Sequence, residues 1–336
     1  MPRTPSRSDD PALRAALARG LDQSPGPEAA ALADHLARVF GAATVALLHY
    51  GSHAQDSGAQ PGSAWDFFVI VDDYGAAYRA LAASRPPGFS AGRAAFLNRI
   101  LPPNVLSVHA PGSAGRLAKC CVLSVRDLER ACSPSPADHF VRARLFQQVQ
   151  RVWVRDDAGR ARVTGAVASA RATTLAWGRP FLPERFDAAA YARTLLEVSY
   201  AAEIRPEDER RVDALMASQG TILVPMYEAL LGDAVARGAL VSEGSAYRDA
   251  RRPGALARAG ARVWFGWSKA RATLRWAKYV ALYDDWLDYV VRKVERRGDV
   301  AVELTPRERR WPLLFLWPKL LRFLWRRPRS APGEPR

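Results

Sequence analysis

The sequence TVALLHYGSHAQDSGAQPGSAWDFFVIVDD, residues 44–73, decides the fold of the first half of the chain. Residues 44–50 and 65–71 are continuous apolar runs rich in strand-forming residues, and a Gly-, Ser- and Gln-rich segment separates them. Short apolar runs bounded by turn residues are typical of buried strands. This stretch therefore predicts two buried strands joined by a loop.

The sequence on either side of this stretch alternates helical and strand patterns. Apolar residues at helical spacing predict three helices, at residues 27–40, 75–84 and 90–100. Short apolar runs predict two more strands, at residues 104–109 and 116–124. Ser124, followed three residues later by Asp127, predicts the N-cap of a further helix. Residues 26–155 are therefore predicted to form a domain of the α/β (α+β) class around one sheet.

Strand patterns almost vanish after Val154. Segments rich in Ala, Leu and Arg follow with helical periodicity, at residues 163–177, 187–203 and 206–231. Asp187 is the predicted N-cap of the second of these helices. The pattern predicts a helical domain over residues 156–240.

Three segments lie outside these two domains. Residues 1–25 are rich in Pro, Ser and charged residues and are interpreted as a flexible N-terminal tail with at most one short helix. Residues 241–255 contain Pro, Gly and polar residues and are interpreted as a linker. Residues 256–297 show a long helical pattern with many Trp and Tyr, within a C-terminal region of distinct composition, residues 241–330.

The charge of the chain is unevenly distributed. The 336 residues contain 49 Lys and Arg and 34 Asp and Glu, for a net charge of +15. Residues 262–336 alone hold 18 basic and 8 acidic residues, which gives +10, and seven of the ten tryptophans. A basic, Trp-rich end predicts an anionic partner with apolar character, and the candidates are a membrane surface and a nucleic acid.

Cysteine use and the start of the chain suggest the compartment. Cys120, Cys121 and Cys132 show no C-x-x-C spacing, so neither a zinc site nor a disulfide framework is predicted. This usage favours a reducing compartment. The first twenty residues lack the apolar core of a secretory signal. Together with the Ala- and Arg-rich composition of the chain, the lack of an addressing segment predicts a bacterial cytoplasmic protein, peripheral on the inner face of the cell membrane.

The strongest chemical signal is Tyr50-Gly51-Ser52 after one strand and Asp66 at the start of the next. Backbone N–H groups of a Gly-Ser turn can bind a triphosphate, and the Ser52 hydroxyl adds a donor. The Asp66 carboxylate can hold a Mg²⁺ that bridges the phosphates. The pattern predicts a nucleotidyltransferase site, although Gly-Ser turns and Asp before a strand also occur as ordinary turn residues. Since Phe68 occupies the usual second acidic position, the candidates for a second carboxylate are Asp72, Asp73, Asp127 and Glu203.

Three segments, residues 50–73, 115–128 and 182–205, together resemble the mitochondrial-type phosphatidate cytidylyltransferase family, also described as a mitochondrial translocator assembly and maintenance family, which has bacterial members. The resemblance covers about residues 40–231, and its third segment is the most specific. It implies a nucleotidyltransferase-fold domain with a mixed sheet, a helical, winged-helix-like domain and a C-terminal amphipathic, membrane-associating region. The implied reaction joins CTP and phosphatidate to give CDP-diacylglycerol and pyrophosphate, with Mg²⁺ as cofactor.

The resemblance also implies roles for individual residues. Asp66 would hold the metal and, with Lys119, serve catalysis. The other implied catalytic residues are Glu203 and Arg205. The implied nucleotide-binding residues are Tyr50, Gly51, Ser52, Ser199, Tyr200 and Arg144. Four positions depart from the family pattern and put substrate identity in doubt, namely His53, Gln148, Ala202 and Glu203.

The segment WPLLFLWPKLLRFLW, residues 311–325, explains much of the basic, aromatic end. It is short for a membrane span and is interrupted by Lys319 and Arg322, so it predicts docking in the membrane interface. Separation of apolar and basic residues favours an anionic lipid surface over nucleic acid. The predicted membrane-binding residues are Trp311, Trp317, Lys319, Arg322, Trp325, Arg326 and Arg327.

Two other functions stay open from the sequence. The chain could be a nucleotidyltransferase that acts on RNA or on a soluble phosphate compound, with the basic end binding nucleic acid. It could also be a catalytically lapsed, membrane-binding relative, since the second carboxylate of the usual pair is missing at Phe68.

Overall fold

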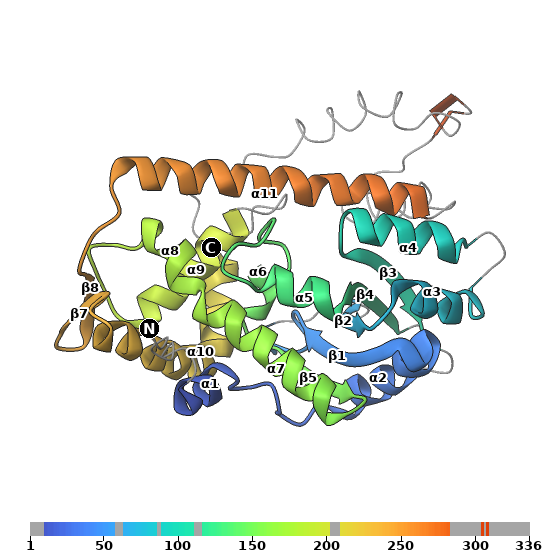
Figure 1. Ribbon diagram of the computed structural model, residues 1–336, viewed down its shortest axis with the longest axis horizontal. Helices are drawn as coiled ribbons and strands as arrows, with labels where there is room; N and C mark the ends of the chain where they lie inside the picture. The colour runs from blue at the N-terminus through green and yellow to red at the C-terminus, as the bar shows by residue number, and fades with distance from the viewer. Residues whose placement is uncertain are drawn as a thin grey trace, which may run out of the picture. The chain divides into compact units, whose positions relative to one another are not determined.

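The two predicted strands of the opening stretch lie at the centre of a five-stranded sheet. The computed structural model describes residues 10–57, 63–85, 89–110, 116–201, 209–282, 304–305 and 307–308. The sheet has the order β3-β4-β2-β1-β5 (Figure 1). Its strands are β1 (Thr44–Tyr50), β2 (Trp65–Val71), β3 (Asn104–His109), β4 (Leu117–Ser124) and β5 (Gln150–Val154). β2 and β4 are parallel and the other pairs are antiparallel, which confirms an α/β class with a mixed sheet.

Helices cover both faces of this sheet. Leu48, Phe68 and Cys121 form one hydrophobic core with α5 (Val125–Ala131), α6 (Arg142–Leu145) and α7 (Asp157–Ala172). The neighbouring strand residues Leu47 and Phe67 are fully buried as well, so the other face is also covered. The remaining helices beside the sheet are α2 (Pro27–Phe40), α3 (Tyr74–Ala82) and α4 (Ala91–Ile100), and the 3-10 turn η2 (Gly41–Ala43) leads into β1.

Several predicted boundaries are confirmed. Gly41 ends α2 with φ of 69°, and the Ser124 hydroxyl accepts a hydrogen bond from the Asp127 N–H at the start of α5. The Asp187 carboxylate accepts one from the Ala190 N–H at the start of α9 (Ala188–Ala201). Such caps satisfy N–H groups that have no partner inside the helix.

A second hydrophobic core lies among the later helices. Tyr191, Leu195 and Tyr227 are fully buried there, between α9 and α10 (Glu209–Ala236). The other elements of this part are α8 (Thr174–Gly178), the 3-10 turn η3 (Arg179–Phe181), and a three-stranded sheet of β6 (Arg185–Phe186), β8 (Ala246–Asp249) and β7 (Leu240–Glu243). The predicted change from strands to helices near residue 155 does not separate the two cores, because Val163 and Val167 of α7 pack with the five-stranded sheet.

The interpretation of residues 241–255 as a linker is wrong for the first half of that stretch. Strands β7 and β8 form an antiparallel hairpin there, and Gly244 with φ of 69° occupies its two-residue turn. Hairpin turns of this length need a residue that tolerates positive φ. The strands are four residues long and contain charged residues, which hides them from a periodicity argument.

The short helix allowed for residues 1–25 is confirmed as α1, but the interpretation as a flexible tail is wrong for residues 10–25. Helix α1 (Pro11–Leu17) buries Leu13 and Leu17 in the second core, and Leu21 is fully buried beside the sheet. The fully buried Arg171 donates hydrogen bonds to the carbonyl groups of Leu17 and Arg19. These contacts fix the segment to the folded chain.

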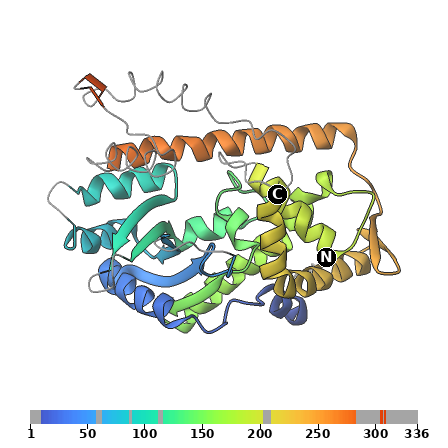
Figure 2. The same ribbon diagram turned by 180° about the vertical axis from the view of Figure 1, so that it is seen from behind.

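Helix α11 (Ala255–Leu282) contacts both parts of this unit, as Figure 2 shows from behind. Its Phe265 packs in the second core. Its Arg275 donates to the Pro102 carbonyl at 2.7 Å and to the Asp138 carboxylate at 2.7 Å. Residues 1–282 form one unit and residues 283–336 another. None of the described helices has both the length and the apolar character needed to cross a membrane.

Candidate functional site

The predicted site lies at one end of the sheet, where strand β1 ends and strands β2 and β4 begin. Tyr50 is the register partner of Asp66, and Asp66 is the register partner of Lys119. Residues paired in register project from the same face of a sheet. Three residues that are far apart in the sequence are thus side by side, at the end of the face that α5, α6 and α7 cover.

Gly51 brings the backbone of the turn against the Asp66 carboxylate. Its φ is 81°, in the left-handed region that favours glycine. A Cβ atom at this position would lie 2.7 Å from Asp66 Oδ2, so a side chain here would displace the Asp66 carboxylate. The Gly51 carbonyl accepts hydrogen bonds from the N–H groups of Ala54 and Gln55, so the chain folds into one compact turn. Both conformation and space therefore require glycine here.

Asp66 and Lys119 are positioned but only weakly paired. Lys119 Nζ lies 3.5 Å from Asp66 Oδ1, and the two side chains are 48% and 24% exposed. This is the only ion pair or hydrogen bond of the Asp66 side chain within the described residues. The Ser52 hydroxyl makes no hydrogen bond to another described residue. A loose, half-exposed pair contributes little to stability, and its charges can turn to a ligand.

Aromatic rings stack on one another beside Asp66 at this end of the sheet. The Trp65 ring stacks on His53 with the centroids 4.1 Å apart and on His49 with the centroids 5.3 Å apart. His53 Nε2 lies 2.8 Å from the Ser63 hydroxyl. Burial lowers the pKa of His49 to about 4, so its imidazole is neutral at pH 7. His49 therefore belongs to the strand interior and is not a poised general base.

Tyr50 and Arg144 lie further along the same face. The Tyr50 hydroxyl is 3.1 Å from Cys121 Sγ inside the core, and burial raises the pKa of Tyr50 well above its usual value. The Tyr50 side chain therefore packs in the core beneath Asp66 and keeps its proton at neutral pH. Arg144 of α6 donates to the Phe140 carbonyl at 2.6 Å, and its positive charge acts on Tyr50 and Cys121. That charge lies on the face that carries Asp66 and Lys119.

Ser199 has its contacts in the interior. Its hydroxyl lies 2.8 Å from His139 Nε2, and both residues are buried. Arg142 Nε donates to His139 Nδ1 at 3.0 Å, so Nε2 carries the hydrogen and donates it to Ser199. Burial, followed by the charges of Arg142 and Arg144, holds the pKa of His139 well below its usual value.

The remaining residues predicted from the third segment divide into two groups. Tyr200 is half-buried and packs against the second core. Glu203 and Arg205 lie outside the described residues. The predicted membrane-binding residues, which fall within residues 311–327, also lie outside them. The structure therefore brings together Tyr50, Gly51, Ser52, Asp66, Lys119 and the charge of Arg144, and it ties Ser199 to His139.

Three candidates for a second carboxylate are at the wrong end of the sheet. Asp72 follows the last residue of β2, six positions after Asp66, which is about 20 Å in a strand. Asp73 caps α3 by accepting the Ala76 N–H at 2.8 Å. Asp127 accepts hydrogen bonds from the Tyr74 and Ser124 hydroxyls at 2.7 and 2.8 Å. None of the three can share a metal with Asp66.

The residues at the site fit Mg²⁺ only if the ion is shared with a bound nucleotide. The described residues contain no group of three or more His, Cys, Asp or Glu side chains that could hold a metal. Mg²⁺ is often held by one or two carboxylates together with the phosphates of a substrate. Asp66, half-buried and weakly paired, fits an ion that arrives with a nucleotide.

Arg211 is a residue that the sequence did not single out. It lies at the start of α10, and its guanidinium donates to the Ser57 carbonyl at 2.6 Å and to the Ser57 hydroxyl at 3.3 Å. It thereby ties α10 to the loop that follows Gly51 and Ser52. No sequence signal marks a contact between residues 154 positions apart.

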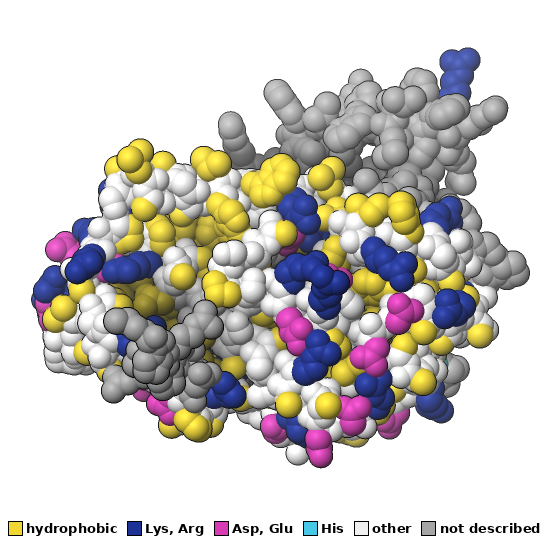
Figure 3. All heavy atoms as spheres, in the orientation of Figure 1, with side chains coloured by type: hydrophobic (Ala, Val, Ile, Leu, Met, Phe, Trp, Pro, Cys, Tyr) yellow, Lys and Arg dark blue, Asp and Glu magenta, His cyan; other side chains and the backbone are white. Residues whose placement is uncertain are grey.

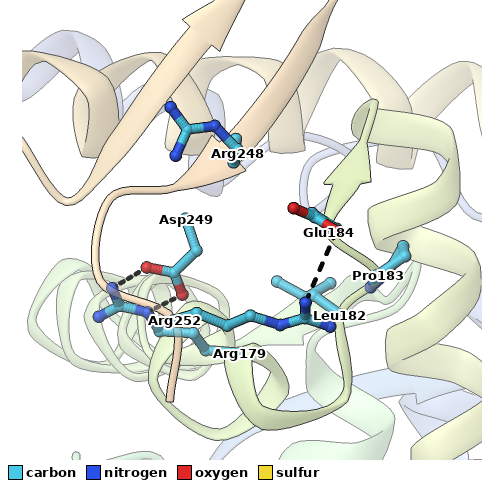
Figure 4. A pocket seen from close by; sticks show the side chains of 7 residues that line it. All are labelled: Arg179, Leu182, Pro183, Glu184, Arg248, Asp249 and Arg252. Carbon is cyan, nitrogen blue, oxygen red and sulfur yellow. Dashed lines mark hydrogen bonds and ion pairs between the residues drawn. The ribbon is translucent and has the colours of Figure 1, made fainter. Parts of the chain in front are cut away.

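A small pocket elsewhere offers less. It measures about 90 Å³ and lies between η3, β6 and β8 (Figure 4). Arg179 forms a two-point ion pair with Asp249, and Arg252 lies 3.8 Å from Glu184. Arg248, the remaining charged lining residue, pairs with Glu243 at 2.8 Å, so each charged side chain of the pocket already has a partner.

Comparison with known proteins adds no family to this geometry. No protein-family model matches the chain, and no curated protein matches it significantly.

Proposed function

We propose that this chain is a nucleotidyltransferase that transfers CMP from CTP to phosphatidate, which gives CDP-diacylglycerol and pyrophosphate on a membrane surface. The observation that carries the proposal is the contact of the Gly51 turn with Asp66, next to Lys119. The choice of CTP and phosphatidate rests on the family resemblance of residues 40–231. The lack of a family match leaves that choice to experiment.

Each candidate residue at this end of the sheet has a role in the proposed reaction. The N–H groups and hydroxyl at Gly51 and Ser52 would bind the triphosphate, and the charges of Lys119 and Arg144 would offset its negative charge. Asp66 would hold Mg²⁺, which when bound neutralises charge on the phosphates. An oxygen of the lipid phosphate would attack the α-phosphorus of CTP in line, and the bond to the bridging oxygen of the β-phosphate would break.

The proposed nucleophile suits a site without a general base. A phosphate monoester is already ionised at neutral pH, so it has no proton that the protein must remove. His49, the nearest buried imidazole, has a pKa of about 4 and stacks on Trp65. The site has to bind, orient and neutralise charge, and its residues are of the types that do so.

The other parts of the chain agree with this proposal. The three-stranded antiparallel sheet beside α9 and α10 is of the kind expected in a winged-helix-like domain. The basic, Trp-rich end suits a protein that works on an anionic bilayer. We propose accordingly that it is peripheral on the cytoplasmic face of a bacterial membrane.

A transfer assay tests the proposal. The full chain is incubated with labelled CTP, Mg²⁺ and phosphatidate vesicles, and the lipid fraction is analysed for CDP-diacylglycerol. Other nucleotides, an RNA acceptor and soluble phosphate compounds are tried in parallel. We expect label in CDP-diacylglycerol. Label on RNA or on a soluble acceptor would instead identify the other transferase function.

Among the described residues, Asp66 is the one candidate metal-binding carboxylate at the site, and this keeps one alternative open. A catalytically lapsed relative would bind vesicles but transfer no nucleotide to any acceptor, and the position of Asp72, Asp73 and Asp127 removes three possible second acids. Vesicle binding without transfer under any of the conditions above would support this alternative and contradict the enzymatic proposal.

A further inference from the structure

Exposed apolar side chains gather on one face of the molecule. Of the seven large apolar side chains that are clearly exposed in the described residues, four lie on α11 and two on α4. Those on α11 are Leu256, Val263, Trp267 and Leu274, exposed by 90, 74, 56 and 56%. Spacings of seven, four and seven residues place all four on one side of a helix. They form a continuous stripe along α11.

Helix α4 extends this stripe. Phe96 and Ile100 are each 61% exposed and lie one helical turn apart. The two helices are in contact, since Lys278 of α11 donates hydrogen bonds to the Leu97 carbonyl of α4 and to the Pro103 carbonyl after it, at 3.4 and 3.2 Å. Figure 3 shows hydrophobic side chains along α11 and over α4 on the same side. We call these six residues the α4–α11 face.

The charge of α11 indicates what this face meets. The helix has six Lys and Arg residues and no Asp or Glu. Arg262 and Lys269 are exposed and form no ion pair with the described residues. The exposed Arg93 of α4 forms none either. A helix without acidic residues that carries an exposed apolar stripe and unpaired cations is typical of a helix that lies in the interface of an anionic membrane.

An apolar groove lies beside the same cations. It measures about 410 Å³ and runs between α9, η3 and α11, with Phe181, Val198 and Phe265 among its lining residues. Arg262 and Lys269 line it as well, and so does Glu197, whose carboxylate pairs with Arg193 at 3.7 Å. Cations beside apolar surface match an amphiphile with an anionic head and an apolar chain. A second copy of this chain would instead place two acid-free, positive helices against each other.

We propose that the α4–α11 face docks the protein on an anionic lipid bilayer. Trp267 and the aliphatic side chains would enter the interface. Arg93, one turn from Phe96, would meet the headgroups, and the long side chains of Arg262 and Lys269 would reach them from the side of α11. The surface belongs to the unit that carries the candidate site, and its residues are distinct in sequence from the predicted anchor at residues 311–327. The inference rests on the proposed function only in taking a bilayer as the partner.

Site-directed labelling tests the proposal without any nucleotide. The three native cysteines are buried, and burial raises the pKa of each thiol, so they react slowly. Leu274→Cys in the full chain therefore gives one reactive thiol on the α4–α11 face. Val241→Cys places a matched thiol on β7, away from this face, where the native side chain is 39% exposed.

We expect a water-soluble maleimide to label both variants rapidly in solution. Vesicles of phosphatidylcholine with phosphatidylglycerol should slow labelling at Leu274→Cys by about tenfold and leave Val241→Cys unchanged. Pure phosphatidylcholine vesicles should protect less. The double variant Trp267→Ser with Phe96→Ser should sediment with the mixed vesicles more weakly than the wild type, because it keeps only the predicted anchor at residues 311–327.

Two results would overturn the proposal. If Leu274→Cys is already protected in solution, another part of the chain or a second copy covers the face. If mixed vesicles bind the protein without slowing this reaction, another segment is the anchor. Neither result depends on nucleotide transfer, so failure of the docking face and failure of the proposed activity are distinguishable.

Discussion

The two ends of the five-stranded sheet carry carboxylates in opposite states. At one end, Asp66 has a single 3.5 Å contact to Lys119 and lies against the Gly51 turn. At the other end, Asp127 accepts two short hydrogen bonds, and Asp72 pairs with Arg155 at 2.5 Å. Carboxylates whose partners are all supplied by the protein hold the structure together. A carboxylate that is fixed in place but nearly without partners is available to a ligand.

Replacing Asp66 should have the largest effect on activity. Asp66→Asn keeps the shape of the side chain but removes its charge, and we expect CMP transfer to fall by about 10²-fold or more. The melting temperature should change little, because the ion pair to Lys119 is long and half-exposed. Rates of CDP-diacylglycerol formation and thermal melts on the same samples check both parts. Full activity in Asp66→Asn would contradict the claim that this carboxylate is functional while those at the opposite end of the sheet are structural.

Gly51→Ala should damage the same end through the backbone. Alanine at φ of 81° costs about 1–2 kcal/mol, and its Cβ would also displace the Asp66 carboxylate. Gly238→Ala is the matched control, because Gly238 has φ of 69° and open space around it. Both variants should lose similar stability in urea titrations, whereas only Gly51→Ala should lose transfer activity. Equal activity losses would show that general destabilisation is the cause.

Asp127→Ala should have the reverse profile. It leaves the Tyr74 and Ser124 hydroxyls without their acceptor and removes polar contacts at the start of α5. The free energy of unfolding should fall by about 1–3 kcal/mol, measured by urea titration. Transfer activity well below the melting temperature should persist. Loss of activity in the folded variant would place Asp127 in the functional machinery.

The sequence predicts the elements better than their juxtapositions. Strands β1 and β2 are long apolar runs, so their positions follow from pattern alone. Strand β5 was not predicted, because QRVWV is short and begins with polar residues. The pairing of Asp66 with Lys119 depends on a parallel register between strands about fifty residues apart, which no local pattern encodes. The hydrogen bond from His139 to Ser199 depends on packing in the same way.

Acid should destabilise the protein through its buried histidines. Burial lowers the pKa of His49 to about 4 and holds that of His139 well below the usual value. Below about pH 6.5 these histidines bind protons in the unfolded chain but not in the folded chain. Each of them therefore lowers the free energy of unfolding by about 1.4 kcal/mol per pH unit. The stability is present above pH 6.5 and is lost as the pH falls toward 4.

His49→Leu isolates this effect at the end of the sheet that carries Asp66. Urea titrations between pH 7 and pH 5 should show a smaller loss of stability in the variant than in the wild type. An unchanged pH dependence would mean that burial does not lower the pKa of His49.

Nucleotide binding tests the central claim most directly, because it requires no acceptor. CTP is titrated calorimetrically in the presence of Mg²⁺ into the wild type, Asp66→Asn and Asp72→Asn. The account predicts that the wild type and Asp72→Asn bind alike, while Asp66→Asn binds at least about tenfold more weakly. Equal binding by the wild type and Asp66→Asn would contradict it.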